Sequence, residues 1–512
     1  MELGATEAGK GVIRHIRTLL PGVWIAGVEK QLHYESTVFD HVITNQFDAF
    51  YGRYPEVDTS ALSISPELHS LMRPYEGKLL NITGLASVRS TMDYPEPIRG
   101  VPTFEDSYDS RKDLLDRHIR YWNFILDEYK IDAIFHENLG QEVFDYVALV
   151  VARAKGIPSL VFNISGQFPR VLFVQESEQG LGDLQLGKTL KQRVGVNLSE
   201  EDPQFIRRSL PAVQKSPDAG LLTVRSQSSN AEYKTSPFIS WLFDRSIYKN
   251  DITPIFVMRA LGRKISRVIK SPAKRLRVFR RSRELLRWTR ASMREEDAHS
   301  KPPNLQASYV YFPLHFQPET STSVKGRHFY TLREAVAFLA GQLPSDWILI
   351  VKEHPHQFRR LLKRVPGFYA QIAAIPNVVL VPHHSENDAL VKHARAIACV
   401  SHSSITAHAV LCGKPVISLG DSHFREAPNY FCVTTTAELR EVMTRISTND
   451  LGANHLAMEE FIRKLESSTF EGEFGERPDT LSESEWNRTM SLTATNIGRA
   501  IVEWLKLRQL AG

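Results

Sequence analysis

The sequence has little cysteine, no long apolar run and no leader-like start. Its 512 residues include only Cys399, Cys412 and Cys432, an odd number at wide spacings, which argues against a disulfide framework and a zinc site. No hydrophobic stretch reaches the roughly 18 residues that cross a bilayer. The first residues carry Glu2 and no apolar core, unlike a secretory signal. We therefore expect a cytoplasmic protein with reduced thiols.

Composition places the chain among ordinary globular proteins. With 28 glycines, 27 prolines and 42% hydrophobic residues, it is not collagen-like, of low complexity or disordered throughout. Its length suits two or three domains. We predict an N-terminal α/β domain in residues 1–250, a basic amphipathic segment with a linker in 251–304, a second α/β domain in 305–445, and C-terminal helices packing across both domains in 446–512.

The net charge of +5 is unevenly distributed. Thirteen lysines and arginines and one acid lie between Arg263 and Arg294, so the rest of the chain carries −7. Apolar residues recur between these cations, which predicts one or two basic helices broken near Pro272. Such a segment fits an anionic membrane surface or another acidic partner, or is a solvated helix face. No recognised nucleic-acid motif surrounds it, so nucleic acid is not an expected partner. The arginines expected to make the contact are Arg275, Arg277, Arg280, Arg281, Arg283 and Arg287.

A β-α-β unit is predicted in the first half. Apolar spacing indicates a helix over 108–130, and the unit follows as a strand at 131–135, a helix at 141–155 and a strand at 157–162. His136 and Glu137 come just after the first strand, at the edge where open parallel sheets bind ligands. Glu137 is the candidate general base for an acceptor hydroxyl, with His136 in reserve. The alternative is that Glu137 only caps the following helix.

Strands and helices alternate throughout the second half, which predicts a doubly wound parallel sheet. The expected helices lie at 332–343, 387–393 and 405–412, with three more at 436–446, 456–465 and 487–510. The expected strands lie at 308–314, 347–352, 378–381, 394–400, 415–419 and 431–434.

Polar residues follow three of these strands, and a parallel sheet brings them to one edge. The arrangement suits a phosphate ester: a helix N-terminus favours an anion, an imidazole donates to or protonates a phosphate oxygen, and an acid accepts from ribose hydroxyls. The alternatives are an ordinary serine helix cap and a His-Pro surface turn. The residues are His315, Gln317 and Glu319 after the first strand, Lys352, His354 and Pro355 after the second, and Ser401, Ser403 and Ser404 after the fourth.

These motifs resemble the C-terminal half of GT-B glycosyltransferases, specifically the capsule polysaccharide biosynthesis family that includes bacterial β-Kdo transferases. The likeness covers residues 308–435 and rests on the pair His354-Pro355, the serine-rich helix start at 401–404 and the stretch at 413–420 followed by Phe424. In that family, and in bacterial sialyltransferases with a similar His-Pro pair, these positions hold the phosphate and cytidine of a CMP-sugar. The loop at 315–319 differs from the family's, so the donor sugar stays open.

The resemblance implies two facing Rossmann-type parallel-sheet domains with bridging C-terminal helices. It also implies a metal-independent glycosyltransferase with His354 and Ser403 or Ser404 at the phosphate, a nucleotide-sugar co-substrate (CMP-activated favoured) and no other cofactor; no Asp-x-Asp suggests a metal. The candidate catalytic residues are His354 and, from its place after a strand, Glu137. The acceptor would be a lipid-linked or polysaccharide chain at the inner face of the plasma membrane. Three alternatives remain: a polyol-phosphate transferase, a nucleotide-sugar epimerase, and a non-catalytic capsule assembly or export factor.

Overall fold

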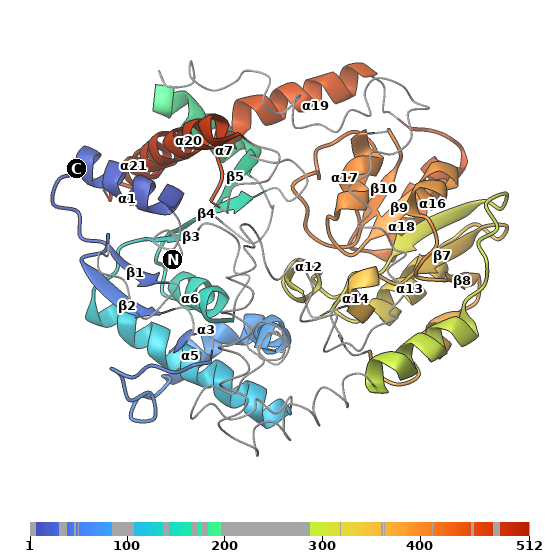
Figure 1. The fold of residues 1–512 in the computed structure, drawn as a ribbon, viewed down its shortest axis with the longest axis horizontal. Coiled ribbons are helices and arrows are strands. Elements are labelled where there is room, and N and C mark those ends of the chain that lie inside the picture. The colour runs from blue at the N-terminus through green and yellow to red at the C-terminus, as the bar shows by residue number, and fades with distance from the viewer. Residues whose placement is uncertain are drawn as a thin grey trace, which may run out of the picture.

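A computed structural model describes most of the chain as two lobes, which lie left and right in Figure 1. The described residues are 7–29, 38–45, 48–49, 51–83, 107–136, 143–164, 171–176, 183–195, 287–317, 319–359, 362, 364–411, 413–451, 455–474 and 482–510.

The C-terminal lobe contains a six-stranded sheet in which every pair of neighbours is parallel. The strand order is β11-β10-β9-β6-β7-β8, so the direction of winding reverses between β6 and β9. Their side chains are buried throughout β6, β9 and β10, as expected for apolar strands covered on both faces. The strands are β6 (Tyr309–Pro313), β7 (Ile348–Lys352), β8 (Val378–Val381), β9 (Ala396–Cys399), β10 (Val416–Ser418) and β11 (Tyr430–Cys432).

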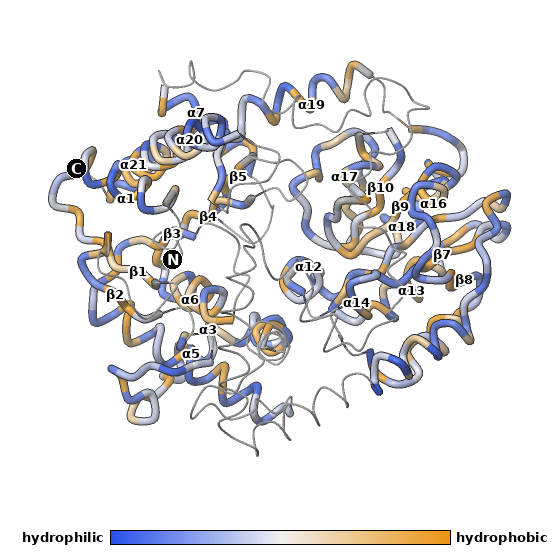
Figure 2. Tube along the Cα trace, in the orientation of Figure 1, coloured by the Kyte–Doolittle hydropathy of each residue, from blue (hydrophilic) through white to orange (hydrophobic). Residues whose placement is uncertain are grey.

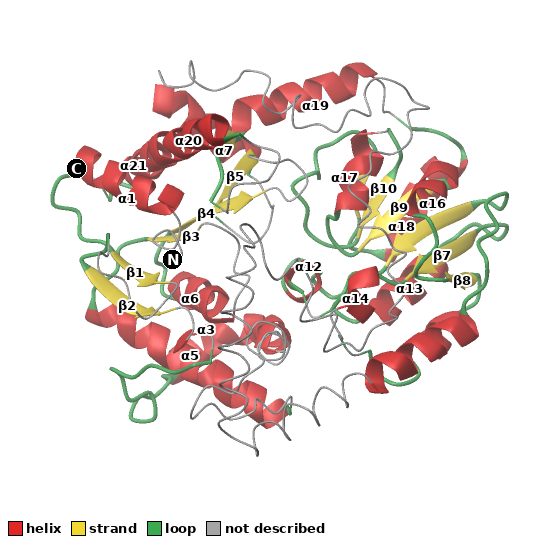
Figure 3. Cartoon of the chain, in the orientation of Figure 1, coloured by secondary structure: helices red, strands yellow, loops and turns green. Residues whose placement is uncertain are grey.

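Helices connect these strands, and Figure 3 shows them flanking the sheet. The doubly wound parallel sheet predicted for this half is confirmed. Three short helices, α12, α14 and α15, were not predicted. The helices of this lobe are α12 (Thr320–Ser323), α13 (Leu332–Ala340), α14 (Pro355–Arg359), α15 (Phe368–Ala373), α16 (Asn387–His393), α17 (Ser404–Leu411) and α18 (Thr436–Ser447).

The N-terminal lobe differs from the prediction. Strands β3 (Ile134–His136) and β4 (Ser159–Ile164) are parallel across α6 (Val143–Ala154), as predicted. However, β5 (Val171–Gln175) pairs with β4 antiparallel, and β12 (Phe470–Glu471) pairs with β5 antiparallel. Only six residues connect β4 to β5, too few for the crossover that a parallel pair needs. The expectation of a second wholly parallel sheet was therefore wrong.

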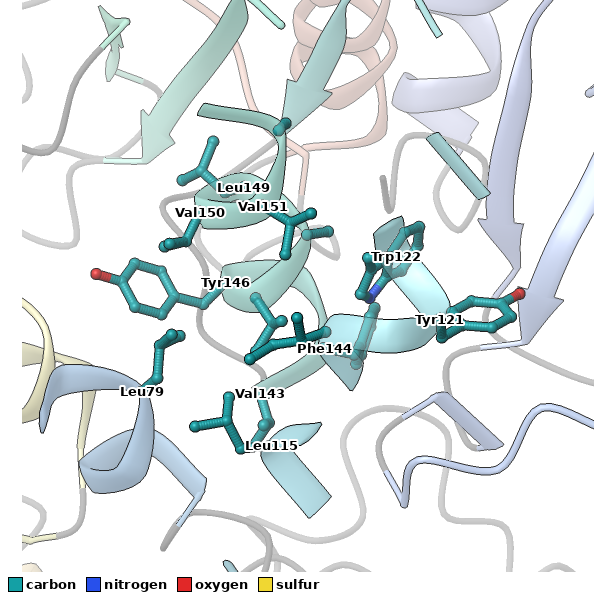
Figure 4. Close-up of a cluster of buried hydrophobic side chains, with 14 of the residues drawn as sticks. Leu79, Leu115, Tyr121, Trp122, Val143, Phe144, Tyr146, Leu149, Val150 and Val151 are labelled. Carbon is teal, nitrogen blue, oxygen red and sulfur yellow. The ribbon is translucent and has the colours of Figure 1, made fainter. Parts of the chain in front are cut away.

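The core of this lobe forms around α6, whose residues 143–152 are all buried. Apart from Asp145 and Tyr146, these buried residues are apolar, so the helix must be covered on every side; Figure 2 shows α6 mainly in the hydrophobic colours. Figure 4 shows Phe144 and Tyr146 of α6 near Trp122 of α5 (Tyr108–Glu128) and Leu79. A two-stranded parallel sheet, β1 (Ala26–Glu29) with β2 (His41–Asn45), and helix α3 (Pro66–Met72) complete the described part.

The C-terminal helices return to the N-terminal lobe. Helix α19 (His455–Ser468) packs on α7 (Leu184–Val194), where Lys191 donates to the carbonyls of Glu466 and Thr469 at 2.9 and 2.8 Å. Gly187 makes this contact close, since a Cβ there would lie 1.9 Å from the carbonyl oxygen of Ser468. The last helices, α20 (Glu483–Leu492), η4 (Thr493–Ile497) and α21 (Gly498–Leu507), pack against α1 (Glu7–Leu19).

Only the end of the basic segment is described. Residues 287–299 are helical, and Arg287, Arg290 and Arg294 are exposed. The opposite face is fixed to the C-terminal lobe because Glu295 caps α15 and Glu296 accepts from the backbone and ring of His383. The remaining arginines expected to contact a membrane lie outside the described residues: Arg275, Arg277, Arg280, Arg281 and Arg283. Within the described ranges, no helix is long and apolar enough to span a membrane.

Candidate functional site

The candidate site lies where the sheet of the C-terminal lobe changes its winding direction. In open α/β sheets, ligands bind outside the carboxyl ends of the strands at this switch point. His315 follows the end of β6, and Ser401 and His402 follow the end of β9, which is paired with β6. The strand order therefore brings the first and third polar loops of the sequence prediction to the position that a ligand would occupy. We call this region the switch crevice.

Several buried polar atoms at the switch crevice lack a hydrogen-bond partner among the described residues. They are His315 Nε2, Ser323 Oγ, Ser401 Oγ and His402 Nδ1. Ser323 and Ser401 are 1% and 0% exposed, so bulk water does not reach their hydroxyls freely. Because buried polar atoms almost always find partners, such a group indicates a place for a polar ligand or ordered water.

A buried ion pair holds the ends of β6 and β7 together. Arg364 binds both carboxylate oxygens of Glu353 at 2.9 Å, and Tyr369 donates to the same carboxylate at 2.8 Å. The Arg364 guanidinium also donates to the carbonyl of His315 at 2.7 Å. Since the Glu353 carboxylate accepts the backbone N–H of His354 as well, one ion pair fixes the backbone of both histidines.

Gln317 is used within its own loop. Its backbone exchanges hydrogen bonds with the side chain of Gln357, and its amide donates to Thr322 and to the carbonyl of Tyr330. Its side-chain oxygen accepts from Arg364 at 2.9 Å. These contacts give Gln317 a role in fixing the loop that follows β6.

His354 has a defined tautomer. Its Nδ1 accepts the backbone N–H of His356 at 3.1 Å and therefore carries a lone pair, which leaves the proton of a neutral ring on Nε2. Burial, with added repulsion from His356 and other nearby cationic groups, lowers the pKa of His354 to about 3. At neutral pH the ring is thus an uncharged donor through Nε2, suited to a phosphate oxygen.

The other histidines of the switch crevice are neutral for the same reason. Burial lowers the pKa of His315 to about 4 and that of His423 to about 3, and it lowers the pKa of His402 well below its usual value. The rings of His402 and His423 lie 4.4 Å apart between centroids. A cluster of uncharged imidazoles can donate hydrogen bonds to an anion but contributes no net charge.

The remaining predicted phosphate ligands have contacts of their own. Lys352 donates to the carbonyl of Ser385 and to Asn387 at 2.7 and 2.6 Å. Ser403 and Thr406 exchange backbone and side-chain hydrogen bonds at the start of α17, so Ser403 is a helix cap. The Glu319 carboxylate accepts from Ser321. Pro355 begins α14, and Ser404 begins α17 with its side chain outside the described part.

The acceptor-side prediction is largely outside the described residues. Glu137 falls in 137–142, so its role stays a prediction. His136 ends β3 and is 2% exposed, and its Nε2 is buried without a partner among the described residues. Burial lowers the pKa of His136 well below its usual value.

Two cavities lie away from the switch crevice. One of about 350 Å³ is beside α5, and one of about 400 Å³ is between β11 and α19. They are lined by exposed residues such as Glu128 and Lys464, among others, and neither includes the four buried unpartnered atoms of the switch crevice. A surface hollow by itself indicates no particular chemistry, whereas a buried polar atom without a partner indicates a polar ligand or ordered water.

Comparison with known proteins finds a family that resembles the segment containing the switch crevice. Residues 295–441 match the family described as "Capsule polysaccharide biosynthesis protein". This segment is similar to the capsule polysaccharide biosynthesis family. The resemblance seen in the sequence is confirmed, and the family segment runs from the end of the basic helix into α18, so it contains β6 to β11.

Other comparisons add little. Among solved structures, the β-Kdo 2,7 transferase KpsC of Thermosulfurimonas dismutans matches 31% of this chain at 15% identity, with a TM-score of 0.20. The match covers 53% of that protein, so this chain spans about half its length. No curated protein sequence matches the chain.

Sequence reasoning missed five residues of the capsule-family segment that shape the switch crevice: Lys325, Glu353, Arg364, His402 and His423. Glu353 and His402 stood inside the polar motifs, so their position was visible but their burial was not. The partnership of Arg364 with Glu353 joins residues 11 apart on either side of α14, and no spacing rule predicts it. Lys325 and His423 lie next to stretches that the sequence analysis used, but no spacing singled them out.

Proposed function

We propose that this chain is a GT-B-type glycosyltransferase that binds a nucleotide-sugar donor in the switch crevice and transfers the sugar to a polysaccharide or lipid-linked acceptor. The observation that carries the proposal is the gathering of buried hydrogen-bonding atoms that have no partner among the described residues, at the switch point of a sheet whose segment matches the capsule polysaccharide biosynthesis family. Nucleotides bind at this point in many doubly wound sheets.

The donor phosphate would be held by neutral hydrogen-bond donors and a helix N-terminus. His354 presents a protonated Nε2, and α17 begins with Ser404, three residues after the buried Ser401. Donors fixed before the ligand arrives favour charge that develops on the leaving phosphate. A CMP-activated sugar is the favoured donor because of the family resemblance.

The reaction also needs a base on the acceptor side. We propose Glu137 for this role, because the residue directly follows β3, at the carboxyl end of a strand. A Glu137→Gln variant is expected to bind nucleotide normally and to lose transfer by about 10²-fold or more. Full turnover in this variant would remove Glu137 from the mechanism but leave the donor site standing.

Nucleotide binding is the first test of the proposal. Calorimetric titration with CMP, CDP and UDP should show binding of at least one, weakened in a His354→Ala variant. His393→Ala is the matched control, because His393 is exposed at the end of α16, which leads into the amino end of β9. No binding by any nucleotide, or equal binding in His354→Ala, would refute the proposed donor site.

Product analysis distinguishes the alternatives. Mass spectrometry of products from a panel of nucleotide sugars, offered with a lipid-linked acceptor, should show the acceptor heavier by one sugar residue. A mass gain that includes a phosphate would identify a polyol-phosphate transferase. An isomerised donor without transfer would identify an epimerase, and glycan binding without nucleotide binding or turnover would identify an assembly factor.

A further inference from the structure

The switch crevice also contains a lysine, Lys325, which none of the sequence motifs included. Lys325 follows α12, and its backbone carbonyl accepts the N–H of Asp421, beyond β10, at 2.9 Å. The preceding residue, Val324, is buried. The loop after β6 and the loop after β10 are therefore joined at Lys325.

Two glycines make this junction tight. A Cβ on Gly326 would lie 2.5 Å from the carbonyl oxygen of Thr322 and 2.8 Å from the Val400 side chain. A Cβ on Gly420 would lie 2.3 Å from the carbonyl oxygen of Lys325 itself. Neither position accepts a larger residue without backbone movement, so the backbone at Lys325 is held against the ends of β9 and β10.

The other described cations at this edge are committed to protein partners. Arg364 is paired with Glu353, the Lys352 ammonium donates to Ser385 and Asn387, and Arg327 is paired with Asp421 at 2.6 Å. The Lys325 ammonium has no hydrogen bond within the described part of the chain, and its electrostatic neighbours are Glu319, His402 and His423.

Charge also distinguishes Lys325 from its neighbours. The histidines here are neutral at pH 7, as shown above. Burial lowers the pKa of Lys325 to about 8, opposed by Glu319, so this amine still carries its charge at pH 7. A phosphate in the switch crevice would thus meet uncharged donors from the imidazoles and serines, and a full positive charge from Lys325.

We propose that Lys325 binds and neutralises the donor phosphate. The inference rests on the proposed function. In the transfer step, the acceptor oxygen forms a bond to the anomeric carbon as the bond from that carbon to the phosphate oxygen breaks. The bonding electrons stay on the phosphate oxygen, and the acceptor proton passes to the general base. The leaving nucleotide gains one negative charge, which the Lys325 ammonium offsets.

Binding of CMP and of cytidine, measured by calorimetry at pH 7, separates a charge effect from a structural one. Lys325→Met should weaken CMP binding about 10- to 100-fold, as loss of a charged hydrogen bond does, and leave cytidine binding unchanged. Lys325→Arg should retain CMP affinity within about threefold. Lys392→Met is the control, since Lys392 is exposed near the end of α16.

These measurements distinguish a failure of the proposed function from a failure of the role proposed for Lys325. If wild-type protein binds no nucleotide, the proposed function fails and this inference with it. If wild type binds CMP and Lys325→Met binds it equally well, only the role of Lys325 is refuted. Equal losses of CMP and cytidine affinity in Lys325→Met would also overturn it, because a displaced loop and not a missing charge would be the cause.

Discussion

The buried pair of Glu353 and Arg364 makes a sharp prediction about the stability of the switch crevice. Their side chains are 0% and 3% exposed, and a Glu353→Gln change would leave the Arg364 charge buried beside a neutral amide. Removing one partner of such a pair costs about 3–5 kcal/mol. Replacing both would not restore the site, because the Tyr369 hydroxyl and the N–H of His354 would still lose their acceptor.

The loss of stability should be greatest at the ends of β6 and β7, which the pair of Glu353 and Arg364 joins. A cost of this size corresponds to a rise of about two to four powers of ten in the population of opened molecules. Hydrogen exchange followed by mass spectrometry should therefore show lost protection in peptides that cover β6 and β7. Peptides from α6, in the other lobe, should change little, because α6 has its own core.

An exposed ion pair supplies the control. Arg333 and Glu334 are paired with side chains 41% and 59% exposed, so Arg333→Gln should cost less than about 1 kcal/mol. Equal exchange in Glu353→Gln and Arg333→Gln would refute the reasoning, because it would mean that the buried pair does not hold the strand ends.

Three further predictions concern acid, packing and membranes. His315 and His423 are neutral in the folded protein, whereas in the unfolded chain they become protonated below about pH 6.5. The stability that the folded protein has above that pH is therefore lost as the pH falls toward 4, by up to about 1.4 kcal/mol per pH unit for each histidine. Urea midpoints that do not fall from pH 7 to 5 would contradict this. Gly187→Ala should lower the melting temperature through a cost of about 1–3 kcal/mol, whereas Gly77→Ala, with open space, should not. Anionic vesicles should sediment the protein at physiological salt, and less of it once Arg280, Arg281, Arg283 and Arg287 are neutralised; unchanged sedimentation would count against a membrane role.

The sequence predicted best those strands that are buried on both faces of the C-terminal sheet. Every strand predicted in the second half appears within a few residues of its expected bounds, because fully buried parallel strands are continuous apolar runs. The N-terminal sheet was predicted less well. The direction of β5 depends on a short connection, and the partner of β5 on its other side, β12, lies about 300 residues away in sequence.

The candidate site shows the same division. The topology made it predictable that His315, His354 and Ser401 would follow neighbouring strands at one edge. The hydrogen bonds of this edge were not predictable. Gln317, for example, is bound by Arg364 and by Gln357 of α14, which come later in the chain. Ser403 caps α17, the alternative that the sequence left open, because the same hydroxyl chemistry serves a cap and a ligand; its place at the phosphate stays a prediction.

The return of the chain to its first lobe sets an order of assembly during synthesis. Strand β12 completes the N-terminal sheet, and α21 packs on α1, yet both are translated after the entire sheet of the C-terminal lobe. The sheet from β6 to β11 can therefore form while the first lobe still lacks an edge strand and two covering helices. A nascent chain that has left the ribosome only as far as α18 would carry the complete six-stranded sheet beside an N-terminal lobe with exposed apolar residues on α1.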